Sequence, residues 1–296
     1  MLRRFFGALA VIALLPSPAF AWGFAAHRLI MRRAIEILPP EIKPFFVEHR
    51  ETLVVRVVDP DMWRTVGWDE DPNHFLNLGM PELGTPPAFT ALPRDYTAAV
   101  QTFGVALLDR HGKLPWREAE MFGSLQRAFA DLGDANAFTV ERLIVFAGAA
   151  SHYIQDATQP LHATVNYDGI ATDQRGVHTR FEADLIERFQ SRLMLTPAAP
   201  TPIGAPRDYA FDTLIASYQR VDALLKADKE ALGAKDTYDD AYYEAFFVKV
   251  KPMLEAQLSA AVTSTASVIV SAWEQAGRPT LYPKVTREAR KVQRAR

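Results

Sequence analysis

The amino-acid sequence predicts an all-α protein, folded as a single multi-helix domain with long loops. Apolar residues recur at helical spacing in most segments of the chain. No stretch of useful length alternates apolar and polar residues as a half-buried strand would. The length of 296 residues, with 49% hydrophobic and 23% charged residues, is ordinary for a globular protein.

The first 21 residues have the pattern of a secretory signal peptide. Arg3 and Arg4 precede an apolar run that is well short of the ~20 residues needed to span a membrane, and Ala19-Phe20-Ala21 offers a small-x-small cleavage site. We therefore expect a secreted or periplasmic protein that is cleaved after Ala21, begins at Trp22 and has no transmembrane segment in its mature chain.

Composition narrows the possible classes of protein further. The chain has no cysteine, so its stability has to come from the core, from bound metal or from both. Loss of Arg3 and Arg4 leaves 31 basic against 35 acidic residues, which is unlike a strongly basic nucleic-acid binder. The tail, 284–296, holds six basic residues and one acidic residue and is expected to be solvated and flexible. The folded domain is thus expected at 22–283, and no stable protein partner is implied.

Prolines and glycines, which end or interrupt helices, separate the expected helices. The stretch from Asp59 to about Pro93 is read as one long loop, and its aromatic and apolar residues argue for a functional rather than a disordered loop. Residues 54–58 are read as an apolar connector. Helices are expected at 27–38, 41–53, 95–110, 117–132, 140–158, 177–193, 208–229 and 236–276, the last kinked or interrupted at Pro252.

The stretch 150–163 is central to the functional prediction. His152 and Asp156 are four residues apart, so on a helix they share one face. Pro160 cannot continue that helix, and the chain should bend just before His162. Imidazole and carboxylate are common zinc ligands, and a carboxylate can bridge two ions. The alternative is a helix with a capping aspartate and two surface histidines.

Three further histidines lie in comparable settings. His27 follows Trp22, whose free amine and carbonyl would form a metal chelate after cleavage. His74 follows Asp61 by thirteen residues and Asp59 by fifteen. His178 is four residues before Glu182.

Each of these pairings alone often does no more than stabilise a helix. Five such histidines in a cysteine-free chain make metal binding the leading explanation, with zinc the favoured ion. His49 and His111 lack such a setting and are read as surface residues.

These motifs together resemble the zinc-dependent phospholipase C and single-strand-specific nuclease superfamily. The shared pattern is W-x4-H at the expected mature N-terminus, an aspartate before a later histidine, H-x3-D-x5-H and H-x3-E, and through these residues it covers nearly the whole mature chain. The resemblance implies three zinc ions, held by Asp61, His74, His152 and Asp156; by His27, Asp156 and the amine and carbonyl of Trp22; and by His162, His178 and Glu182.

Two features of the pattern are ambiguous. Asp59 and Asp61 flank Pro60, and Asp61 is preferred because its D-x-x-R context, ending at Arg64, resembles the nuclease branch. W-x4-H also resembles the nucleases, whereas Glu182 resembles the bacterial phospholipases.

The resemblance implies hydrolysis of phosphodiesters, with Asp61 as the candidate to guide the proton of the attacking water. Glu182, the absence of cysteine and the negative charge favour a phospholipid substrate. The alternatives are a single-strand-preferring nuclease or 3′-nucleotidase and a non-catalytic secreted metal-binding protein. Candidate substrate contacts are Trp63, Phe75, Asn166, Tyr167 and Asp168.

Overall fold

The computed structural model describes residues 22–86, 88–134 and 137–281 of the chain. The predicted signal peptide, 1–21, and the predicted basic tail, 284–296, lie outside these residues. The predicted domain, 22–283, therefore stays a prediction at its boundaries.

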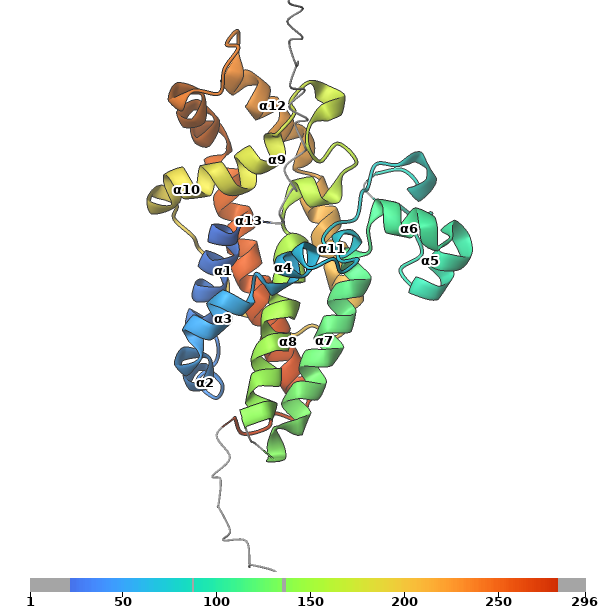
Figure 1. Cartoon of the computed structure of the whole chain (residues 1–296), viewed down its shortest axis with the longest axis vertical. Coiled ribbons are helices and arrows are strands. Elements are labelled where there is room, and N and C mark those ends of the chain that lie inside the picture. Colours follow the sequence, from blue (N-terminus) through green and yellow to red (C-terminus); the bar gives the residue numbers. More distant parts are fainter. Residues whose placement is uncertain (1–21, 87, 135–136, 282–296) are drawn as a thin grey trace, which may run out of the picture.

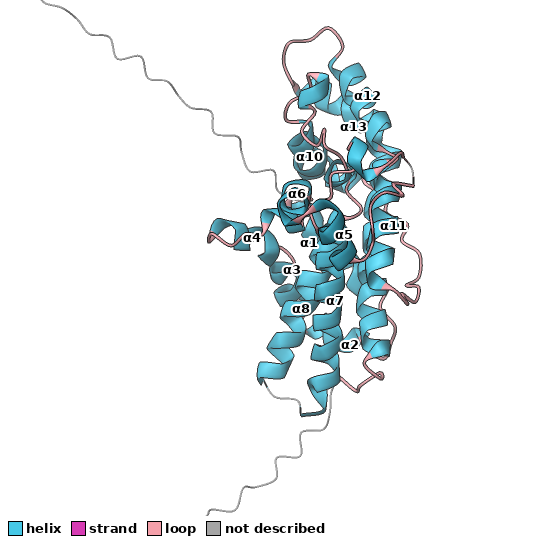
Figure 2. Cartoon of the chain, turned by 90° about the vertical axis from the view of Figure 1, so that its right-hand side faces the viewer, coloured by secondary structure: helices cyan, strands magenta, loops and turns pink. Residues whose placement is uncertain are grey.

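The all-α fold class is confirmed. The described residues contain helices and loops, and their one isolated β-bridge joins Leu78 to Thr164 (Figure 2). The α-helices are α1 Phe24–Glu36, α2 Lys43–Glu48, α3 Arg50–Arg56, α4 Asp59–Thr65, α5 Tyr96–Phe103, α6 Val105–His111, α7 Leu114–Ala130, α8 Ala137–Asp156, α9 Val177–Thr179, α10 Leu185–Phe189, α11 Pro206–Tyr218, α12 Val221–Leu232 and α13 Asp240–Gln275. Short helical turns are η1 Asp71–Asn73, η2 Pro81–Leu83, η3 Asp131–Asp134, η4 Pro160–Ala163, η5 Ile170–Thr172, the π-helical η6 Arg180–Asp184 and η7 Gln190–Arg192.

Helix α13 forms the axis of the fold. Figure 1 shows it, orange to red, along the long axis of the molecule, and it packs against α1, α7, α8 and α12. It is long and apolar enough to cross a membrane by length and composition, but 61% of its most apolar window is buried inside the protein, as expected for a core helix. The expected interruption at Pro252 is absent, because this proline lies on the exposed face, where water can satisfy the backbone carbonyl left without a donor. A kink there stays a prediction.

Several expected element boundaries were wrong. The segment 41–53 forms two helices, α2 and α3, and α3 runs into the expected connector as far as Arg56. Helix α4 occupies the start of the expected long loop, because Pro60 stands in its first turn, where no backbone donor is needed. The segment 208–229 is divided into α11 and α12.

The loop after α4 is held by backbone contacts with the segment that follows α8. The backbone N–H of Leu76 donates to His162 O at 3.0 Å, and that of Leu78 donates to Ala163 O at 2.9 Å. Gly112 allows α6 to approach the same loop, since a Cβ there would collide with the backbone of Phe75. This pairing brings His74 beside the break in α8.

The two histidines expected on the surface differ in their surroundings. His111 is buried, and its backbone carbonyl accepts a hydrogen bond from the N–H of Asn77 at 2.7 Å, so the expectation of a surface residue was wrong. His49 is partly buried at the junction of α2 and α3, with its ring 4.6 Å from that of Phe45. Neither belongs to the histidine cluster described next.

Candidate metal centre

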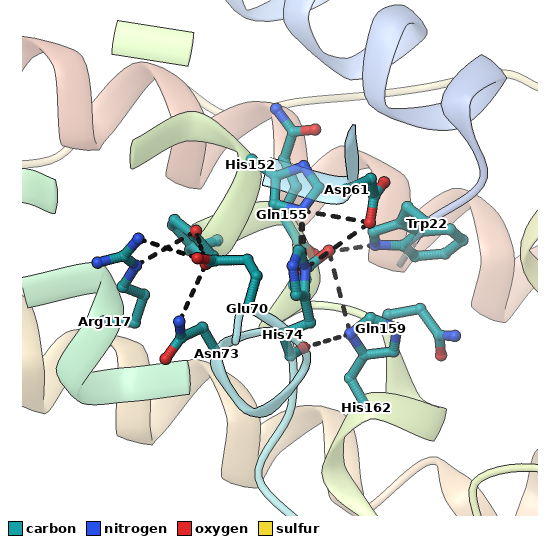
Figure 3. A network of polar contacts seen from close by, with 12 residues as sticks. Trp22, Asp61, Glu70, Asn73, His74, Arg117, His152, Gln155, Gln159 and His162 are labelled. Atoms are coloured by element: carbon teal, nitrogen blue, oxygen red, sulfur yellow. Dashed lines mark hydrogen bonds and ion pairs between the residues drawn. The ribbon is translucent and has the colours of Figure 1, made fainter. Parts of the chain in front are cut away.

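The carboxylate of Asp156, at the end of α8, is surrounded by imidazoles. Its Oδ2 lies 3.2 Å from His152 Nε2 and 3.0 Å from His74 Nδ1, and its Oδ1 lies 3.4 Å from His27 Nε2. These histidines come from α8, the loop after α4, and α1, and all of them are buried. Figure 3 shows two of them, His74 and His152. One carboxylate thus joins three segments that are distant in sequence.

Asp61 approaches the same two ring nitrogens, His74 Nδ1 and His152 Nε2, that Asp156 approaches. Its Oδ1 is 3.8 Å from His74 Nδ1 and 3.9 Å from His152 Nε2, and its side chain is fully buried. Asp59 instead forms an ion pair with Arg56 at 3.1 Å nearer the surface. The fold therefore brings Asp61, and not Asp59, into the cluster.

A third set of ligand-type side chains lies next to the first two. His162, in η4, follows the break that Pro160 introduces, and its Nε2 is 3.8 Å from Glu182 Oε2. His178 Nε2 is 2.7 Å from the same carboxylate oxygen. His162 Nδ1 is also 4.0 Å from Asp156 Oδ1, so this set adjoins the Asp156 cluster.

Backbone and amide acceptors fix the orientation of three rings. The Nδ1–H groups of His152 and His162 donate to backbone carbonyls, those of Val57 at 2.8 Å and His74 at 2.6 Å. His27 Nδ1 is 2.6 Å from Gln155 Oε1. With Nδ1 occupied in this way, the Nε2 atom of each ring faces the carboxylates, which is the ring orientation found around bound metals.

The donor set fits a divalent metal ion. Three groups of side chains each bring ligand atoms within 4.8 Å of one another: His27, His152 and Asp156; Asp61, His74 and His152; and His162, His178 and Glu182. Buried atoms in these groups have no hydrogen-bond partner among the described residues, namely both carboxylate oxygens of Asp61, Asp156 Oδ1, Nε2 of His27 and His74, and Nδ1 of His178. Such unpaired atoms cost roughly 1–3 kcal/mol each, and nitrogen with oxygen donors suits zinc.

Burial and neighbouring charges shift the pKa values of the side chains in the cluster. Burial opposes ionisation of Asp156, but the charge of His152 and the hydrogen bonds from the surrounding histidines together outweigh it and hold the pKa of that carboxyl well below its usual range. Burial also opposes protonation of His152, yet Asp156 and Asp61 raise its pKa to about 9. In the third group, burial raises the pKa of Glu182 to about 8 and lowers that of His178 to about 4. The raised pKa values of His152 and Glu182 mean that these two side chains retain protons, and a metal cation would have to displace those protons on binding.

Trp22 lies against the end of α8. Its Nε1–H donates to Gln155 O at 2.9 Å and to Thr158 Oγ1 at 3.1 Å, and its ring is fully buried. The next residue, Gly23, approaches η6 so closely that a Cβ would lie 2.9 Å from Ala183 Cβ. These contacts hold the segment directly before α1 and His27, and chelation by the amine and carbonyl of Trp22 stays a prediction.

A polar network behind His74 holds its loop in place. Glu70 accepts hydrogen bonds from the Tyr153 hydroxyl, from Arg117 Nη2 at 3.2 Å and from Asn73 Nδ2 at 3.0 Å (Figure 3). The Tyr153 ring lies 5.6 Å from that of His74. Sequence reasoning missed this network, whose one signal is the nearness of Glu70 to His74 and of Tyr153 to His152 along the chain.

A buried ion pair holds the helical segment of the third group. Arg180, between His178 and Glu182, donates from Nη2 to Asp228 at 3.1 and 3.2 Å and from Nε at 3.2 Å. Asp228, in α12, also accepts from Gln174 Nε2 at 2.7 Å and from a tyrosine hydroxyl of α13. π-Helical turns such as η6 occur frequently at functional sites, and this one carries Arg180 and Glu182 on its buried side.

A cavity of about 300 Å³ opens beside the centre. Its walls include metal-ligand candidates together with cationic, polar and apolar side chains: His74, His162, His178, Arg64, Arg110, Asp71, Asn77, Phe75, Leu161 and Tyr167. Phe75 and Tyr167 were candidate substrate contacts from the sequence. Arg110, Asn77 and Leu161 were missed, because no local pattern marks them.

The other candidate substrate contacts do not line this cavity. Trp63 packs against Trp68, with ring centroids 5.7 Å apart. Asn166 binds Thr172 Oγ1 through its Nδ2 at 3.1 Å. Asp168 Oδ1 accepts from Gly176 N at 2.9 Å, which shapes the loop before α9.

The fold and the site define a helical protein with a buried histidine–carboxylate centre of several adjoining groups. A family model described as zinc-dependent phospholipase C matches residues 26–247, which is most of the chain. The chain therefore belongs to the zinc-dependent phospholipase C family, as the sequence motifs predicted.

A curated relative from Bradyrhizobium tropiciagri is described as a probable serine protease. It is 28% identical over 155 residues, and the match covers 45% of this chain. The chain spans only 19% of the length of that relative, so the relative's description applies to a much longer protein.

Proposed function

We propose that the protein is a secreted zinc-dependent hydrolase of phosphodiester bonds that acts, like a phospholipase C, on the head-group ester of a phospholipid. The observation that carries the proposal is the convergence of three buried ligand groups next to one cavity. Family membership supports the zinc-dependent class. Three zinc ions are proposed, one for each group.

Asp156 is proposed as the ligand shared between two ions. Its two oxygens face different neighbours: Oδ2 lies next to His74 and His152, while Oδ1 lies next to His27 at 3.4 Å and His162 at 4.0 Å. The complete proposed ligand set is Trp22, His27, Asp61, His74, His152, Asp156, His162, His178 and Glu182.

When bound, zinc ions supply positive charge for the phosphodiester and make a nearby water molecule more acidic. Asp61 is proposed to accept the proton of the attacking water, because both its oxygens are free of hydrogen bonds to the described residues. Arg64 lies in the cavity wall with Nη1 3.7 Å from Asp61 Oδ1, where its charge suits a phosphate oxygen. Arg110 adds a second cation to the same wall.

A phospholipid is favoured as the substrate because Phe75 and Leu161 give the cavity apolar contacts for a glycerol ester, beside cations that suit its phosphate. A single-strand-preferring nuclease or 3′-nucleotidase is the second candidate. Tyr167 favours it, since this half-exposed aromatic ring in the cavity wall could stack on a base.

Secretion and processing are part of the proposal. Cleavage after Ala21 would place the new amine on Trp22, beside α8 and directly before the helix that carries His27. Intact-mass measurement of exported protein tests this. A mature chain that begins at any other residue would remove the proposed terminal chelate.

The test of function is a parallel assay of the purified protein on phosphatidylcholine and on single-stranded nucleic acid, with chelator and then with zinc restored.

Asp61→Asn is expected to lower the rate by about 10²–10⁴-fold, the usual contribution of a general base. Asp59→Asn is the matched control, because it changes a nearby carboxylate outside the cluster. Activity on nucleic acid alone would favour the nuclease, and activity on neither substrate would favour a non-catalytic metal-binding protein.

A further inference from the structure

We propose that two exposed apolar segments at the mouth of the cavity dock the protein on a zwitterionic phospholipid bilayer. We call them the rim: Met62, Val66 and Trp68 on one side, and Val165, Tyr167 and Ile170 on the other. The inference rests on the proposed phospholipid substrate and adds the surface through which the enzyme would reach it.

The rim holds an unusual share of the exposed apolar side chains. Six of the 14 large hydrophobic side chains exposed in the described part of the chain belong to these two short segments. Val66 is 68% exposed, Trp68 61% and Ile170 55%. Figure 2 shows α4 and the turn after it standing out from the body of helices. Grouped exposed apolar residues of this kind mark interaction surfaces, whereas scattered ones do not.

The rim is continuous with the proposed active site. Arg64 belongs to the first segment and Tyr167 to the second, and both line the cavity that also contains His74 and His162. The two segments therefore flank one opening. A surface that covers the rim would present its molecules directly to this cavity.

The size of the cavity indicates what the rim contacts. Ligand pockets commonly hold about 300–1,000 Å³, and this cavity, with about 300 Å³, lies at the small end of that range. A head group with its glycerol ester suits a site of this size better than a whole lipid with two long acyl chains. We therefore place the acyl chains in the bilayer during hydrolysis and the opening of the cavity at the bilayer surface.

The chemistry of the rim fits that position. Tryptophan and tyrosine favour the interface between lipid and water, because their rings are apolar and carry one polar group. Asp69 places an exposed carboxylate next to Trp68, whereas beside Ile170 the exposed charges of Asp173 and Arg175 oppose each other. The rim therefore has no excess of positive charge to attract an anionic surface, and a zwitterionic bilayer, such as phosphatidylcholine, suits it better.

The experiment uses the zinc-loaded protein and a double variant, Val66→Ser with Ile170→Ser, neither of which lines the cavity. The matched control is Met194→Ser with Val248→Ser, whose side chains are 73% and 59% exposed elsewhere. Binding is measured by co-sedimentation with phosphatidylcholine vesicles, and catalysis on vesicles and on a short-chain, water-soluble phosphatidylcholine. Removing two apolar side chains from a lipid contact should weaken vesicle binding by roughly 10–100-fold.

The expected result is loss of vesicle binding and vesicle hydrolysis in the rim variant, with hydrolysis of the soluble substrate unchanged and the control like wild type. Unchanged binding by the rim variant, or no binding by wild type, would overturn the proposal. Self-association of wild type that the rim variant abolishes, without an effect on vesicles, would assign the rim to a second copy and also overturn it. Rim-dependent vesicle binding without phospholipid hydrolysis would retain the docking surface and refute the phospholipase function.

Discussion

Asp228→Asn is expected to unfold the protein at a clearly lower temperature. Asp228 is fully buried and makes three contacts of 3.1–3.2 Å with the Arg180 guanidinium, besides its bond from Gln174. Removing one charge from a buried pair leaves the other without compensation, which typically costs about 3–5 kcal/mol. For a domain of this size, each kcal/mol lowers Tm by about 2–4 °C, so the expected drop is roughly 6–20 °C.

The same substitution is expected to weaken the third metal group. Arg180 lies between His178 and Glu182 and also donates to the backbone carbonyl of Arg175 at 2.8 Å, so it holds η6 against the preceding loop. Without Asp228 this anchor is lost, and the two ligand candidates are no longer held together. We expect zinc content to fall by one ion out of the proposed three, measured by elemental analysis after gel filtration.

Glu230→Gln is the matched control for Asp228→Asn. Glu230 lies on the same helix, α12, but forms an exposed ion pair with Lys249 at 2.8 Å, and exposed pairs contribute little to stability. An equal Tm for the two variants would refute the role of the buried pair. Replacing both partners by apolar residues, Arg180→Met with Asp228→Leu, should recover only part of the lost Tm, because the buried tyrosine hydroxyl of α13 loses its partners, and should not restore the zinc content.

Three further predictions concern the centre and its surroundings. Asp156→Asn should remove more zinc than His49→Ala, because Asp156 adjoins two ligand groups; elemental analysis checks this, and a full zinc content would show that it bridges nothing. Chelation should increase hydrogen exchange at Trp22 and in 59–78, and equal exchange with and without zinc would show that packing alone holds these segments. Burial, then the charge of Asp156, raises the pKa of Glu118 well above 4.5, so its contribution to stability is present at low pH and is lost as pH rises through the folded pKa. Glu118→Met should therefore stabilise the protein more at pH 9 than at pH 5 in denaturant titrations, and the same gain at both pH values would contradict this.

Local sequence patterns were sufficient for the fold class and for part of the centre. Helical spacing predicted an all-α protein, because each helix must bury one apolar stripe and the stripe is visible in the sequence. His152 and Asp156 could be placed together because residues four apart share a helix face. Pro160 marked the end of α8 for an equally local reason, since it lacks the backbone donor that the helix needs.

Local patterns were ambiguous where a residue has two roles. Pro60 was read as part of a loop, although proline also starts helices, and α4 begins beside it. Asp59 and Asp61 could not be separated by spacing. Their different burial, which depends on how α4 packs against α8, is what distinguishes them.

Only the tertiary structure decided which distant residues meet. Arg180 and Asp228 are 48 residues apart, and Glu70 and Tyr153 are 83 apart. Neither pair leaves a periodic trace, because the partners lie on separate elements whose relative position is set by packing of the whole core. The cavity wall formed by Arg64, Arg110 and Tyr167 has the same origin. The sequence by itself thus determined the helices and the residue types of the centre, while the packing of the helices around α13 determined the arrangement of its parts in space.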